Sequence, residues 1–261
     1  WPMLRLLQGD VGSGKTIIAA FSAIRAAEQG YQTALLAPTE LLAEQHYHNF
    51  LNWLHPLKIS VCLITGQMNS KELYKNLTGI KKGYWQLVIG THAIFQEKVE
   101  FKNLVLTIID EQHRFGVHQR MALLEKTEFG LNPHQLILTA TPIPRTLTMA
   151  LYGDMDLSII DELPKGRKPI QTLVMTKKDR TSVIHKIAKS IISGQQVYWV
   201  CTIIEDSDMI DAQSAKSLHQ EIKSKLPGKR IALLHGQLKS DEKLRSMALF
   251  KAHEIDLLIA T

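Results

Sequence analysis

The sequence predicts an α/β fold in which short buried strands form parallel sheets and longer helices pack against them. Short apolar runs alternate with amphipathic stretches along all 261 residues, and this alternation is typical of parallel sheets with helices on both faces. The composition agrees, because 45% of the residues are hydrophobic and 21% are charged, close to the average of globular proteins. No apolar run approaches the roughly 18 residues that a membrane helix needs.

Six apolar runs in the first part of the chain are too short for helices and are expected to be buried strands. Helices are expected from Lys15 to about Gly30, after Thr39, and from Ser70, because Gly30 is typical of a helix end and Thr39 of a helix cap. The expected strands are Leu4–Leu7, Thr33–Leu36, Ser60–Ile64, Leu87–Ile89, Val105–Ile109 and Leu136–Leu138.

The alternation stops at Asp161–Pro169, where prolines, a glycine and charged residues predict a linker. We therefore expect a first domain over 1–160, a linker over 161–171 and a second domain over 172–261. Each chain end lies in a strand-like run, so both ends are expected to be cuts inside a longer protein. In the second domain we expect strands at Thr172–Met175, Gln196–Cys201, Arg230–Leu234 and Asp256–Thr261, and helices at Arg180–Ile192, Asp211–Lys225 and Asp241–Ala252.

Charge and cysteine content narrow the class of protein further. The net charge is +6 and the isoelectric point is about 9.2, which fits nucleic-acid binding. The basic excess is spread over both halves and does not form a tail. Cys62 and Cys201 lie far apart in apolar runs, which favours buried free thiols over a disulfide or a metal site. A reducing, cytosolic compartment is therefore expected.

A glycine-rich segment after the first expected strand has the spacing G-x-x-x-x-G-K-[ST] of a phosphate-binding loop. The glycines allow a tight turn whose N–H groups face phosphate oxygens, and the next helix adds the positive end of its dipole. Lys15 is expected to reach the β- and γ-phosphates, and the Thr16 hydroxyl to bind Mg²⁺. The alternative is a turn that binds nothing. The segment comprises Gly9, Asp10, Val11, Gly12, Ser13, Gly14, Lys15 and Thr16.

An acidic pair follows the expected strand Val105–Ile109. The Mg²⁺ of a phosphate-loop enzyme needs a carboxylate as a second anchor, and ligands bind at the carboxyl edge of open α/β sheets. Asp110 is therefore expected to bind the metal, and Glu111 to act as general base on the attacking water. Taken alone, such a pair is more often a solvated acidic turn after a buried strand, and the phosphate-binding loop before it favours the metal-binding interpretation.

With these residues in place, the chain resembles the superfamily 2 helicases of the DExH type. Asp110, Glu111, Gln112 and His113 form the DExH string. Other matches follow in the family's order: residues 37–43 resemble motif Ia, residues 90–92 motif Ib and residues 139–142 motif III. Residues 198–201 and 234–238 resemble parts of a second motor domain.

Two longer strings narrow the resemblance. Residues 110–117 and 141–146 are similar to those of helicases that remodel branched DNA and of transcription-repair coupling factors, and Gln112 favours the former. The resemblance implies two RecA-like P-loop NTPase domains with parallel sheets, an ATP-binding domain over 1–160 and a truncated C-terminal domain over 172–261. It implies an ATP- and Mg²⁺-dependent helicase that remodels forks and junctions in recombination and repair. We expect it to act as a monomer on branched double-stranded DNA in the bacterial cytosol, away from membranes.

The resemblance also assigns roles to single residues. Lys15, Asp110, Glu111, Gln112 and His113 are the expected catalytic set. A second set is expected to contact DNA or to couple DNA to the nucleotide, although Thr39 has capping of the next helix as an alternative, and hydroxyl groups suit both tasks. That set comprises Thr39, Glu40, Thr91, His92, Thr139, Thr141, His235 and Gly236.

Three other functions stay open for this chain: a coupling-factor motor, a P-loop nucleotide switch and a non-enzymatic DNA-binding fragment. The family's Q motif, branch-engaging domain and motif VI are absent from the 261 residues. Little ATPase activity is therefore expected of this piece, because an arginine finger accelerates related reactions by roughly 10³–10⁵. Trp53, Trp85 and Trp199 are expected in the core. His46, His48 and His118 are expected at the surface or the core edge, with no metal bound.

Overall fold

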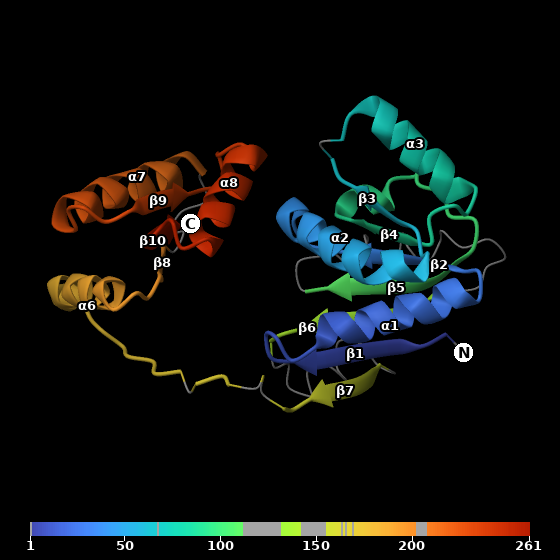
Figure 1. Cartoon of the computed structure of the whole chain (residues 1–261), viewed down its shortest axis with the longest axis horizontal. Helices are drawn as coiled ribbons and strands as arrows, with labels where there is room; N and C mark the ends of the chain where they lie inside the picture. The colour runs from blue at the N-terminus through green and yellow to red at the C-terminus, as the bar shows by residue number, and fades with distance from the viewer. Residues whose placement is uncertain are drawn as a thin grey trace. The chain divides into compact units, whose positions relative to one another are not determined.

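The computed structural model describes residues 2–66, 68–111, 132–141, 155–162, 164, 166–168, 170–201 and 208–261 (Figure 1). The chain forms two compact units, Trp1–Lys168 and Pro169–Thr261. The boundary between them lies within the segment 161–171 that the sequence marks as a linker. Two expected site residues, Gln112 and His113, lie outside the described residues, and so does His118.

A seven-stranded sheet forms the centre of the first unit (Figure 1). Its strand order is β3-β4-β2-β5-β6-β1-β7, and every neighbouring pair is parallel. The parallel α/β fold expected from the sequence is thereby confirmed. The strands are β1 (Leu4–Gly9), β2 (Gln32–Leu36), β3 (Val61–Ile64), β4 (Leu87–Gly90), β5 (Leu104–Asp110), β6 (His134–Thr139) and β7 (Asp156–Ile160).

Both faces of this sheet are buried, which explains why its strands read as continuous apolar runs. Successive residues of β1 alternate between the two cores: Leu7 packs in the core beneath α1 and α2, and Leu6 packs in the core on the other face with Ile80 of α3. The helices of this unit are α1 (Lys15–Glu28), α2 (Glu40–Leu54) and α3 (Ser70–Lys81), with short 3₁₀ helices η1 (His55–Leu57) and η2 (His92–Phe95).

The second unit contains a three-stranded parallel sheet in the order β8-β10-β9. Ile184, Ile222 and Leu257 share one buried core in this unit, and Phe250 and Leu258 share another. The elements are η5 (Lys177–Asp179), α6 (Arg180–Ile192), β8 (Val197–Val200), α7 (Asp208–Lys225), β9 (Ile231–Leu234), α8 (Ser240–Lys251) and β10 (Leu257–Ala260).

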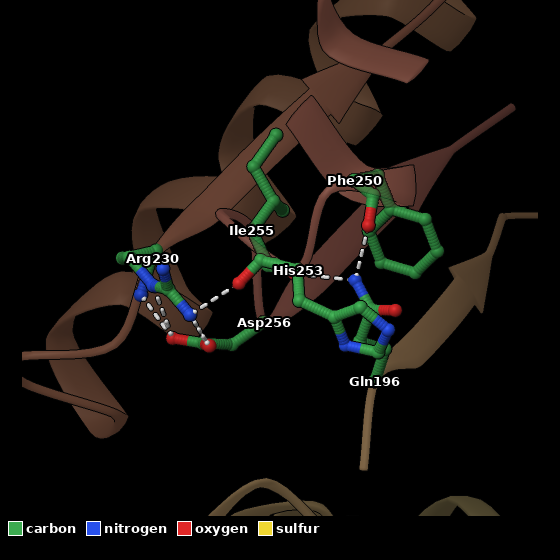
Figure 2. A network of polar contacts seen from close by, with 6 residues as sticks. All are labelled: Gln196, Arg230, Phe250, His253, Ile255 and Asp256. Atoms are coloured by element: carbon green, nitrogen blue, oxygen red, sulfur yellow. Dashed lines mark hydrogen bonds and ion pairs between the residues drawn. The ribbon is translucent and has the colours of Figure 1, made fainter. Parts of the chain in front are cut away.

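A polar network fastens the amino ends of these three strands (Figure 2). Gln196, Arg230 and Asp256 each directly precede a strand of the sheet. The Arg230 guanidinium lies 2.6 Å from Oδ1 of Asp256 and also donates to the His253 carbonyl oxygen at 2.8 Å. The Gln196 amide donates to the carbonyl oxygens of Phe250 and Ile255. These bonds satisfy polar groups where the strands start, at the edge opposite to the expected ligand edge.

Two expectations about local structure are wrong, and one strand was missed. Thr172–Met175 is not a strand, because its side chains find no apolar surface to cover and Val174 is 98% exposed. Strand β7 was not predicted, since Asp156 and Ser158 interrupt its apolar run. Trp53 is 42% exposed and so lies outside the core, although its ring contacts Phe50.

Two further expectations concern the state of the two cysteines and the absence of a membrane-spanning segment. Cys62 is buried, Cys201 is half-buried, and both are free thiols. Burial raises the pKa of the Cys62 thiol far above its usual value. None of the helices in the described part of the chain is long and apolar enough to cross a membrane.

Candidate functional site

The glycine-rich segment joins β1 to α1 as a tight loop. Strand β1 ends at Gly9 and α1 begins at Lys15, with Gly14 as its N-cap residue. Gly12 and Gly14 have φ angles of 82° and 102°, in the left-handed region that favours glycine. The first turn of α1 contains no acidic residue, so the positive end of the helix dipole is left for an anion.

Lys15 lies across this loop. Its Nζ donates to the carbonyl oxygen of Gly9 at 2.7 Å and to that of Asp10 at 2.9 Å. The side chain is half-buried, so the ammonium is held close to the loop rather than extended into solvent. A cation in this position can pass from carbonyl oxygens to phosphate oxygens with a small movement.

The DExH string begins at the end of β5. Asp110 is the last residue of this strand, and its Oδ2 lies 2.8 Å from Nε2 of His46 on α2. Glu111 follows with a φ of 51°, a left-handed backbone that is uncommon for any residue other than glycine. Unusual backbone conformations of this kind concentrate at functional sites.

The end of β6 and the motif III segment that follows it contact Glu111. Oε1 of Glu111 accepts a hydrogen bond from the N–H of Ala140 at 3.2 Å, and its own N–H donates to the Leu138 carbonyl oxygen at 3.0 Å. The hydroxyls of Thr139 and Thr141 lie 2.9 Å apart. Glu111 is therefore fixed to the end of β6 by both its backbone and its side chain.

The strand order explains why these segments share one edge. Strands β5, β6 and β1 are consecutive neighbours in the sheet and run in parallel. Their carboxyl ends therefore lie side by side and carry, in turn, the acidic pair, the motif III threonines and the phosphate loop. Within the described residues, no group of three His, Cys, Asp or Glu could hold a metal ion by itself. A magnesium site here would need phosphate or water oxygens besides Asp110 and Thr16.

The residues expected to contact DNA in the first unit follow β2 and β4 at the same edge. Thr39 caps α2, with its Oγ1 accepting from the N–H of Leu42 at 3.3 Å, and Glu40 accepts from the N–H of Gly66 at 3.1 Å. Thr91 is buried and His92 is exposed at the start of η2. Thr39 thus has the capping role that was its alternative, and a capping hydroxyl can also contact a phosphate.

The remaining two expected residues belong to the second unit. His235 directly follows β9 and is buried, and the Gly236 carbonyl oxygen accepts from Nζ of Lys243 at 2.7 Å.

Sequence reasoning missed two residues that contact this site. His46, expected at the surface or the core edge, is buried against Asp110. Arg167, placed in the linker, lies 2.6 Å from Oδ2 of Asp10. A hydrogen bond from the Val11 N–H and the nearby Arg167 guanidinium hold the pKa of Asp10 below its usual value. No signal in the sequence indicated the contact of Arg167, because β7, the strand that brings this segment beside the loop, was itself not predicted.

These features define a P-loop NTPase domain of the helicase type. The sequence profile of the DEAD/DEAH box helicase family matches residues 4–150. The chain therefore belongs to the DEAD/DEAH box helicase family.

Within this family the chain is similar to the ATP-dependent DNA helicase RecG. It is 53% identical to RecG of Escherichia coli K12 and 46% identical to RecG of Aquifex aeolicus, in each case over the whole chain. The chain spans 38% and 33% of the length of these two relatives. The resemblance to DNA helicases of this kind that was drawn from the sequence is thereby confirmed.

Solved structures agree with this relationship. A structure of RecG bound to a three-way DNA junction matches the whole chain with a TM-score of 0.76 and 37% identity, and the match covers 33% of that chain. Saccharomyces cerevisiae Dbp5 bound to RNA and ADP BeF3 matches 99% of this chain and 66% of its own with a TM-score of 0.70. At 16% identity the second match supports the RecA-like fold alone.

Proposed function

We propose that this chain is the motor part of an ATP-dependent helicase that moves along double-stranded DNA and remodels branched DNA. The observation that carries the proposal is the placement of the phosphate loop, the motif III threonines and the acidic pair on the neighbouring strands β1, β6 and β5. The similarity to RecG, whose solved structure contains a three-way DNA junction, supports branched DNA as the substrate.

Each residue of the edge has a proposed role in ATP hydrolysis. The N–H groups of the loop and Lys15 bind the phosphates, and Thr16 and Asp110 hold Mg²⁺, which supplies charge neutralisation on the phosphate oxygens. Glu111 takes a proton from the attacking water. Its bond to the Ala140 N–H connects the water-activating carboxylate to motif III. We propose that Thr139 and Thr141 pass the state of the nucleotide to the DNA-contacting residues through this connection.

Contacts with DNA are proposed along the same edge. The start of α2 at Thr39 offers a hydroxyl and a helix N-terminus, which both suit DNA phosphates. The exposed His92 lies at the corresponding position after β4. His235 and Gly236 contribute from the second unit. Recombination and repair in the bacterial cytosol are the proposed setting.

ATP hydrolysis by the protein at the full length of its relatives tests the proposal. The rate is measured without DNA, with linear duplex and with a model fork at one fixed salt concentration, because phosphate contacts depend steeply on salt. Stronger stimulation by the fork than by linear duplex is expected. Equal stimulation would favour a coupling-factor motor, and no response to either DNA would favour a nucleotide switch.

A further inference from the structure

A turn that follows β7 contacts the phosphate loop. Strand β7 ends at Ile160 and pairs in parallel with β1 (Figure 1). The chain that leaves β7 therefore emerges at the same edge of the sheet as the loop that leaves β1. This chain then leads from the first unit into the second.

The local sequence explains how the chain turns back. The N–H of Arg167 donates to the Pro164 carbonyl oxygen at 3.1 Å, which closes a four-residue turn. Gly166 directly precedes Arg167 and has a φ of 82°, in the left-handed region that favours glycine. Any residue with a side chain at position 166 would strain the backbone.

The turn contacts two consecutive residues of the loop and lies beside the next. One terminal nitrogen of the Arg167 guanidinium lies 2.6 Å from Oδ2 of Asp10 and donates to the Val11 carbonyl oxygen at 3.1 Å. A Cβ atom placed on Gly12 would lie 3.3 Å from Cγ of Pro164. Arg167 thus joins a side chain and a backbone group of the loop through one nitrogen.

We propose that Arg167 is a positioning residue of the nucleotide site, which holds the tip of the phosphate loop in the shape that receives phosphate. This inference rests on the proposed function. A loop that is already held in its binding shape loses less conformational freedom when the ligand arrives, so the affinity is higher.

The exposure of the ion pair between Arg167 and Asp10 indicates whether its loss should change nucleotide affinity or global stability. The side chains of Arg167 and Asp10 are 30% and 38% exposed, and ion pairs this exposed contribute little to global stability. Removing Arg167 should therefore change nucleotide affinity and the motion of the loop while leaving the melting temperature unchanged. If the ion pair served only stability, removing Arg167 would lower the melting temperature and leave the nucleotide affinity unchanged.

Binding of a fluorescent ATP analogue with Mg²⁺ to the whole chain provides the first measurement. Arg167→Ala is expected to weaken binding about twofold to fivefold. The affinity of Arg167→Lys is expected to fall between those of Arg167→Ala and the unmodified chain, because lysine keeps the charge on a side chain that is one atom shorter. Lys168→Ala is the matched control, since it removes the same charge from the exposed neighbouring residue, and it should bind as the unmodified chain does.

The second measurement is hydrogen exchange of the backbone amides at residues 10–14 in the absence of nucleotide. Exchange should be faster in Arg167→Ala and unchanged in Lys168→Ala. Unchanged exchange in Arg167→Ala would overturn the inference, as would unchanged affinity. If the unmodified chain bound no nucleotide, the proposed function would fail, and the exchange measurement would still decide whether Arg167 holds the loop.

Discussion

Nε2 of His46 lies 2.8 Å from Oδ2 of Asp110, and the two side chains are only 10% and 16% exposed. His46 belongs to the buried face of α2, where Phe50 contacts the edge of its ring. Helix α2 begins directly after Thr39, which is expected to contact DNA. Helix α2 therefore joins the two proposed sites: it starts at the proposed DNA contact, and its His46 is hydrogen-bonded to Asp110, the proposed Mg²⁺ ligand.

Replacing His46 should weaken Mg²⁺ binding at the nucleotide site. His46→Leu removes the partner that orients Asp110, and loss of such a partner lowers metal affinity by about 10- to 100-fold. His46→Gln should retain most of the affinity, because its amide can donate from a similar position. Titration of Mg²⁺ against a fixed concentration of fluorescent nucleotide measures the effect.

The exposed His48 on the same helix offers a matched control. His48→Leu is expected to leave the Mg²⁺ midpoint where it is. An unchanged midpoint in His46→Leu would mean that the contact with Asp110 has no part in metal binding.

Glu111→Gln should separate nucleotide binding from hydrolysis. The glutamine oxygen can still accept from the Ala140 N–H, so the end of β6 keeps its contact. The amide cannot take a proton from water, and loss of a general base slows reactions by about 10²–10⁴. Single-turnover hydrolysis and nucleotide binding, both measured in the protein at the full length of its relatives, test this. Failure of the variant to bind nucleotide would assign Glu111 a structural role.

Acid should weaken the second unit through Asp256. Hydrogen bonds and charge from Arg230 hold the pKa of Asp256 below its usual value of 3.8. A carboxyl with a lowered folded-state pKa adds stability above its unfolded-state pKa and loses it as the pH falls through the folded-state value. The loss should therefore begin near pH 4 and continue below it.

Asp256→Asn tests this acid dependence. The variant should melt a few degrees lower than the unmodified chain at pH 6, and the difference should shrink toward pH 3. Asp241→Asn, which alters an exposed carboxylate of the same unit, serves as the control. A difference between Asp256→Asn and the unmodified chain that stayed constant from pH 6 to pH 3 would contradict the assignment.

Much of the fold follows from patterns that are local in the sequence. The phosphate loop has fixed spacing, and buried parallel strands such as β2 and β5 stand out as apolar runs. Helix α6 begins and ends at the residues expected, Arg180 and Ile192. Strand β7 escaped prediction because Asp156 binds Arg5 of β1 in an ion pair, a partner that only the folded sheet supplies.

The site residues that escaped prediction depend on contacts between distant segments. His46 and Asp110 are 64 positions apart, and Arg167 and Val11 are 156 positions apart. Nothing in the residues around His46 distinguishes it from His48, two positions along the same helix. The strand order decides which segments meet at the edge of the sheet, and no single motif contains that information.

Equilibrium binding of nucleotide to the chain and to Lys15→Ala tests the proposed nucleotide site most directly. Lys15 supplies charged hydrogen bonds to phosphate, and their loss should weaken binding of an ATP analogue with Mg²⁺ by about 10- to 100-fold. Lys71→Ala, at an exposed position on α3, should bind as the unmodified chain does. Equal affinity in Lys15→Ala and the unmodified chain would contradict the assignment of this loop as the phosphate site.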